Sequence, residues 1–80
     1  MDRMLAKHVI SVGFHSAALL EDLISILKDH CDDAEFQGFL KSIGSVIAEI
    51  GLEIFDKVYE QYPDLKTEVE TKISKYGKFI

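Results

Sequence analysis

The 80-residue sequence predicts an all-α protein, and three periodic stretches carry this prediction. Apolar residues between positions 36 and 54 recur at alternating steps of four and three, the spacing of one face of an α-helix. A similar spacing runs from position 5 to position 26, and a shorter one follows Pro63. We therefore expect a single domain, residues 1–80, built as a long antiparallel helical hairpin with a short third helix.

The first helix is predicted over about residues 2–29. Its apolar arc spans roughly 160°, broader than the ~100° stripe that packing against one neighbour requires. Gly13 costs about 1 kcal/mol inside a helix relative to alanine, so a break near this residue is an alternative. The seam expected to face the hairpin partner comprises Leu5, Val9, Val12, Ser16, Leu19, Leu23 and Ile26.

A short connection follows, with the features of a helix start. Asp32 is a favourable N-cap, and Glu35 stands three residues later, as in a capping box. Cys31 and Phe36 occupy the two positions of a hydrophobic staple. So short a loop makes the two long helices antiparallel neighbours.

The second helix is predicted over about residues 33–62, because Pro63 biases Tyr62 away from helical dihedral angles. Gly44 and Gly51 lie beside its seam, with Ala48 between them, and we expect another backbone to pass close to these two glycines. The seam comprises Phe36, Leu40, Ile43, Ile47, Ile50 and Ile54.

The third helix is predicted over about residues 63–76, with Gly77 as the residue that ends it. Its apolar stripe of Leu65, Val69, Ile73 and Tyr76 is narrow, so we expect it to lie on the surface of the hairpin. The residues that it should cover are Ile10, Phe14, Leu52, Phe55 and Tyr59.

The loop end of the hairpin stays uncovered in this arrangement. A chain of this size buries only about 60% of its unfolded surface, so a second copy would add the missing area. We expect a homodimer that completes a helix bundle. The candidate dimer interface consists of Leu20, Ile24, Leu27, Phe39 and Val46.

Composition argues against several classes of protein. The net charge of -5 and the lack of a basic run argue against nucleic-acid binding. The single cysteine, Cys31, suits a reducing cytoplasm, and no tract is long and uncharged enough to suggest a membrane span. A secretory signal is the alternative for residues 3–20, but Ser11 and His15 interrupt its apolar part. We expect a cytoplasmic protein.

An acidic ridge is the sharpest chemical feature: Glu49, Glu53, Asp56 and Glu60 follow helical steps. His8 and His15 are expected level with it, which invites a metal site at this His–carboxylate flank. The Glu-x-x-His signature of di-iron bundles is missing, so weak His–Glu pairs on a solvated face are the simpler interpretation. We expect no catalytic residue, cofactor or metal.

The function predicted from these features is a small acidic protein–protein interaction module, an adaptor, inhibitor or regulator without catalytic activity. Its partner would present a basic surface to the acidic ridge. The alternative is a dimeric bundle that binds a small apolar ligand between Phe14, Phe36, Phe39, Phe55 and Tyr59. An enzyme that uses the His–carboxylate flank ranks third.

Overall fold

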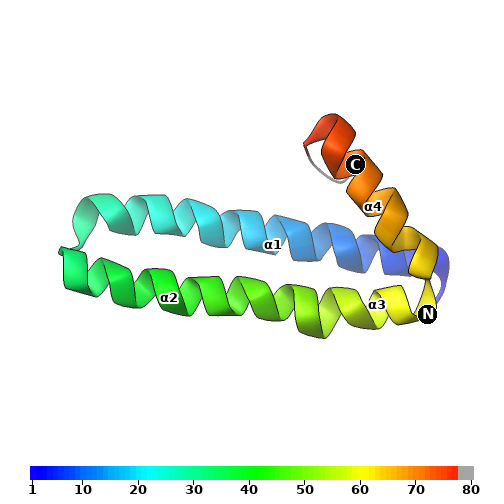
Figure 1. Cartoon of the computed structure of the whole chain (residues 1–80), viewed down its shortest axis with the longest axis horizontal. Coiled ribbons are helices and arrows are strands. Elements are labelled where there is room, and N and C mark those ends of the chain that lie inside the picture. Colours follow the sequence, from blue (N-terminus) through cyan, green and yellow to red (C-terminus); the bar gives the residue numbers. More distant parts are fainter. Residues whose placement is uncertain (78–80) are drawn as a thin grey trace.

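A computed structural model describes residues 1–77 and confirms that the protein is all-α, with no β-strand in that part. The order of elements is α1 (Arg3–His30), α2 (Asp33–Glu49), the π-helical segment η1 (Ile50–Phe55), α3 (Asp56–Gln61) and α4 (Pro63–Tyr76). In Figure 1, α1 lies beside the continuous rod of α2, η1 and α3, which runs in the opposite direction. The short α4 crosses at the end where the chain begins.

Local sequence determines where these helices begin and end. The Asp2 carboxylate accepts a hydrogen bond from the Leu5 backbone N–H at 2.8 Å, and the Asp32 carboxylate accepts one from that of Glu35 at 2.8 Å. The predicted N-cap at Asp32 is thus confirmed. Gly77 adopts the left-handed conformation, with φ of 76°, as expected for the residue that terminates α4.

The first helix is continuous through Gly13, so the alternative of a break at this residue is wrong. Gly13 is buried, and a Cβ atom placed there would overlap the ring of Phe55. The glycine therefore allows a close approach between α1 and η1, and its missing side chain leaves room for the aromatic ring. Packing, rather than a bend, accounts for this residue.

The second helix is interrupted by η1, which the expected uninterrupted helix did not include. The Asp56 backbone N–H donates to the carbonyl oxygen of Gly51, five residues earlier, so the turn contains one extra residue. An extra residue rotates everything that follows by roughly 100° about the helix axis.

The sequence explains why this rotation is favourable. The seam that passes through Ile54 would continue to Lys57 and Gln61, which are polar. One residue along, the series Gly51, Phe55, Val58 and Tyr62 has the same steps of four, three and four and is apolar. The π-helical turn exchanges the first series for the second, so Val58 is buried, whereas Ile54 is 41% exposed.

The face that α1 turns toward the second helix differs from the expected seam. Ala6, Ile10 and Gly13 are its buried residues, whereas Leu5, Val12, Leu19, Leu23 and Ile26 are exposed. Both arcs are apolar, but the inward arc carries small residues at positions 6, 13 and 17. Small side chains allow two helices to come closer, and this favours the inward arc for the contact.

The expectation that Gly44 and Gly51 are close-packed is wrong. A Cβ atom at either position would meet no neighbouring atom within 4 Å. The close approach occurs from the other side, where Gly13 of α1 faces Phe55.

The core lies where α4 meets the hairpin. Five residues exposed by 2% or less form it: Ala6, Ile10, Val58, Leu65 and Val69. Of the residues that the third helix was expected to cover, Ile10 belongs to this core, and Phe14, Phe55 and Tyr59 pack against it. Leu52 is 61% exposed, so its predicted burial is wrong; it lies about half a turn from Ile50, which contacts α1.

Ion pairs reinforce this docking. The Arg3 guanidinium lies 2.6 Å from the Asp64 carboxylate and 3.3 Å from that of Glu68. The Lys7 ammonium lies 3.0 Å from the second oxygen of Glu68. The beginning of α1 is thereby joined to α4 by charge as well as by apolar contact.

Candidate interaction surface

One side of the hairpin exposes a row of apolar side chains along α1. Lys7 pairs with Glu68 of α4, and Phe14 packs against the core that α4 completes. Leu5 and Val12 precede these two residues by two positions, which places them about 200° around the helix from α4. Their row therefore faces away from α4.

The second helix extends this apolar row. Phe39 is 46% exposed and Val46 is 51% exposed. Each precedes a residue of the α2 seam by one position, just as Leu19 and Leu23 precede the half-buried Leu20 and Ile24. In an antiparallel pair of right-handed helices, residues that precede the facing positions lie on the same side of the pair. We call this surface the open face; it comprises Leu5, Val12, Leu19, Leu23, Ile26, Phe39 and Val46.

The residues of the predicted dimer interface fall into two groups. Phe39 and Val46 are exposed on the open face, whereas Leu20, Ile24 and Leu27 are half-buried. Seven-residue steps link Leu20 and Leu27 to Gly13, so these two leucines share the arc that faces α2. A partner on this side would meet their exposed neighbours Leu19, Leu23 and Ile26 first.

The four acidic residues of the predicted ridge are exposed: Glu49, Glu53, Asp56 and Glu60. They do not form one straight line, because the extra residue of η1 turns Asp56 and Glu60 by roughly 100° relative to Glu49, which precedes η1. Glu53 also lies 3.9 Å from Lys57, one turn later on the same rod. The acidic groups spread around the rod instead of making a single ridge.

The expected pairing of His8 and His15 with this ridge is wrong. Both histidines are exposed and follow the buried Ala6 and Gly13 by two residues. They therefore point about 200° away from the arc that meets the second helix. Among residues 1–77 no three His, Cys, Asp or Glu side chains come together as a metal site would require.

The pKa of the loop cysteine is raised by its surroundings. A hydrogen bond with Glu35 is the largest cause that raises the pKa of Cys31, followed by partial burial and the negative charges of Glu35 and Asp32. A raised pKa disfavours the thiolate, which is the form that attacks electrophiles and binds metals. The surroundings of Cys31 therefore favour its thiol form over the thiolate.

The aromatic residues proposed to line a ligand cavity do not surround one space. Phe14 and Phe55 stack with ring centroids 4.9 Å apart, and Tyr59 lies 6.3 Å from Phe55. Phe36 and Phe39 belong to the loop end of α2. A groove of about 430 Å³ does separate α1 from the end of α4, and of the five aromatic residues only Phe14 lines it. Its other lining residues include Ser11, His15, Glu21, Ile73 and Gly77.

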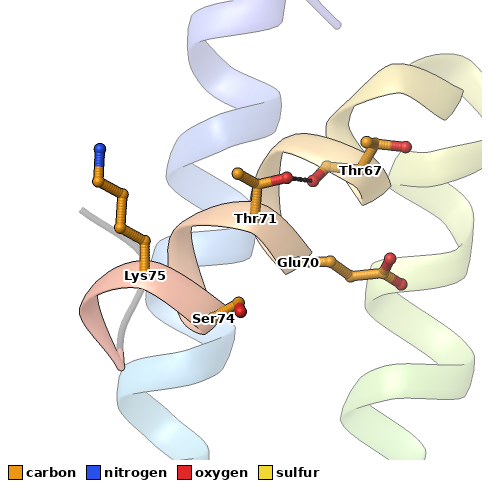
Figure 2. Close-up of a pocket in the computed structure, with 5 residues that line it drawn as sticks. All are labelled: Thr67, Glu70, Thr71, Ser74 and Lys75. Carbon is orange, nitrogen blue, oxygen red and sulfur yellow. Dashed lines mark hydrogen bonds between the residues drawn. The ribbon is translucent and has the colours of Figure 1, made fainter.

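A second hollow lies on α4 alone and is shown in Figure 2. Its lining residues are Thr67, Glu70, Thr71, Ser74 and Lys75, all exposed and all from this single helix. The Thr71 hydroxyl donates to the Thr67 carbonyl oxygen at 2.8 Å, so it is used within the helix. With one helix as its only wall, this hollow does not gather groups around a ligand.

By length and composition, α1 could cross a membrane, contrary to the expectation that no tract could. The helix has 28 residues, and its most apolar 18-residue window has a mean hydropathy of 1.5. Core helices of soluble proteins and secretion signals share these properties, so they do not place α1 in a bilayer. No known protein family, curated protein or solved structure matches the chain.

Proposed function

We propose that this protein is an interaction module without catalytic activity, and that it binds a protein partner through the open face. The observation that carries the proposal is the exposure of seven large apolar side chains, each 41–58% exposed, on two adjacent helices. Contiguous apolar patches of this kind mark sites of association, because water contact with them is unfavourable.

The size of the open face supports a protein partner. From Leu5 to Ile26 the row is about 32 Å long at 1.5 Å per residue. Two helices packed 8–10 Å apart make a face about 20 Å wide, so its whole footprint, which includes the polar Ser42 and Glu49, is roughly 600 Å². A footprint of this size with seven large apolar side chains in it is comparable with the larger patches that monomeric proteins expose.

Charge favours a protein over a lipid surface. The edge of the open face on α1 carries Asp22 and Asp29 and lacks the lysine and arginine excess of helices that lie on membranes. The net charge of -5 also opposes the approach of this chain to an anionic lipid surface.

Photo-crosslinking in the cells that produce the protein tests this function. A photoreactive amino acid at position 19, in the middle of the open face, should give discrete adducts with protein. The matched control is position 52, because Leu52 is 61% exposed and Leu19 is 58% exposed, but Leu52 lies outside the open face. Adducts with lipid alone at position 19, or equal protein adducts at both positions, would refute the proposal.

A further inference from the structure

The exposed row on α1 has the spacing of a coiled-coil seam. Leu5, Val12, Leu19 and Ile26 recur every seven residues, and Val9, Ser16 and Leu23 lie between them. This alternation of three and four keeps a seam facing a parallel or antiparallel neighbouring helix along its whole length. The arc toward α2 is already occupied, so the seam is available to a further helix.

A second heptad series runs along the edge of this seam. His8, His15, Asp22 and Asp29 stand seven residues apart, and all four are exposed. Each lies on the edge farther from α2, since His15 follows the inward-facing Gly13 by two positions. Among residues 1–77, the five ion pairs that the structure records involve none of these four side chains.

The order of charge along this edge selects a partner and its direction. The first half of α1 carries the two histidines and the second half carries the two aspartates. A parallel second copy would set like groups beside like. In an antiparallel arrangement, His15 lies opposite Asp22 of the second copy and His8 lies opposite Asp29 of the second copy. An imidazole can donate a hydrogen bond to a carboxylate whether it is neutral or protonated.

We infer that a second copy of this chain covers the open face, with the two α1 helices antiparallel about a two-fold axis. This inference names the partner of the surface proposed above and rests on that proposal. Such a contact is isologous, so each pairing occurs twice. The two-fold axis passes α1 near residue 18.

The second helix meets its own copy in the same arrangement. Because α1 ends at His30 and α2 begins at Asp33, residue 18 is level with about residue 45. Val46 therefore lies beside the two-fold axis, close to Val46 of the second copy. Phe39 is seven residues away, so the two copies of Phe39 are about 20 Å apart along the bundle.

The buried area is sufficient for a specific dimer. Two open faces of roughly 600 Å² each would bury about 1,200 Å², the lower end of the range for stable interfaces. The product is a four-helix core in which α1 contacts both α2 and the α1 of the second copy. Each α4 remains on the outside.

Sedimentation equilibrium of the full chain at micromolar concentration is the first test. We expect a dimer that Leu19→Glu weakens at least tenfold, whereas Leu52→Glu changes its dissociation constant by less than about twofold. A monomeric wild-type chain refutes the inference, as does a dimer that Leu19→Glu leaves intact. If the chain is monomeric and instead floats with vesicles of phosphatidylethanolamine and phosphatidylglycerol, the open face binds lipid, and the inference of a second copy is also refuted.

Disulfide trapping tests the direction. In a Cys31→Ser background, Val46→Cys should oxidise to a covalent dimer, and Phe39→Cys should not. A parallel dimer would treat both variants alike, because equal positions then lie level at every height of the bundle, and equal behaviour of the two variants would therefore contradict the antiparallel arrangement. Trapping of Phe39→Cys alone, or of neither variant, contradicts the placed axis.

Charge exchange tests the edge pairs. His15→Asp should weaken the dimer about threefold to tenfold, because it places two aspartates together at two symmetric positions. The double variant His15→Asp/Asp22→His restores opposite groups and should return the dissociation constant to within about twofold of wild type. A double variant as weak as the single variant refutes the pairing. If the chain is monomeric but position 19 still gives protein adducts in cells, the inference of a second copy is refuted and the proposed interaction function is retained.

Discussion

The two ends of the hairpin have similar apolar content but different burial. At the end that carries α4, Ile10, Val58 and Leu65 are exposed by 1% or less. At the loop end, Leu19 and Ile26 are each 58% exposed, although their side chains are no less apolar. A pair of helices buries only the stripe between them, so a third element is required before a second face can be covered. The comparison shows that burial in this chain depends on that third layer.

Truncation of core and open-face leucines is expected to separate the two ends most strongly. Leu65→Ala removes a fully buried side chain and should lower the free energy of unfolding by about 2–5 kcal/mol. Leu19→Ala should change it by less than about 0.5 kcal/mol when the chain is dilute enough to be monomeric. Urea unfolding measures both values, and equal losses would mean that the ends are not differently buried.

Deletion of one residue tests the boundary that η1 sets between the two ends. Removal of Leu52 should convert η1 to an ordinary α-helix and leave Phe55 and Val58 in place, so stability should change by less than about 1 kcal/mol. Removal of Ser42 rotates the buried Ile43 outward and should cost at least about 2 kcal/mol. Circular dichroism during urea titration gives the free energy of unfolding of each deletion variant. If removal of Leu52 lowered the free energy of unfolding as much as removal of Ser42, η1 would not contain one residue in excess of an α-helix.

Two glycines should respond to alanine with opposite signs. Gly13→Ala places a methyl group against the Phe55 ring, and overpacking of about 1–3 kcal/mol should exceed the gain of about 1 kcal/mol in helix propensity. Gly44→Ala meets open space and should stabilise the protein by up to about 1 kcal/mol. Thermal unfolding of the two variants shows whether each substitution raises or lowers the melting temperature. Stabilisation by Gly13→Ala would show that α1 and η1 are farther apart than the structure has them.

The smallest effect is expected from the charges that hold α4. Glu68 accepts contacts from Arg3, Lys7 and Lys72, so Glu68→Gln should cost about 1 kcal/mol or less, whereas Glu70→Gln on the same helix should cost less. Chemical unfolding at neutral pH compares the two variants. Equal losses would show that the ion pairs add nothing to the docking of α4.

The same contacts predict how stability depends on pH. The hydrogen bond with Lys7 is the largest cause that lowers the pKa of Glu68 from 4.5, and the hydrogen bond with Arg3 is the largest that lowers the pKa of Asp64 from 3.8. A carboxylate with a lowered folded pKa stabilises the protein above its unfolded pKa and loses this contribution as pH falls through the folded value. Unfolding between pH 6 and 2 should therefore show a loss that begins below about pH 4.5. That loss should be smaller in Glu68→Gln.

The periodic spacing of apolar residues was sufficient to predict the all-α class, and short-range chemistry was sufficient for several helix ends. Asp32, Pro63 and Gly77 act on their own turns of backbone, so their effects can be read without knowing the rest of the fold. The change of series from Ile54 to Phe55 was also visible in the sequence and could have indicated η1. The series from His8 to Asp29 at seven-residue steps was also visible in the sequence, but an analysis of each helix by itself did not detect it.

Only the tertiary structure decided which apolar arc of α1 meets the second helix. The arc with Leu5 and Val12 and the arc with Ile10 and Gly13 are both apolar, so hydrophobicity alone does not distinguish them. The choice depends on how closely two backbones can approach, which is a property of the pair and not of either sequence stretch. The Phe55 ring fits only where Gly13 provides the space, and this contact turns the first arc outward as the open face.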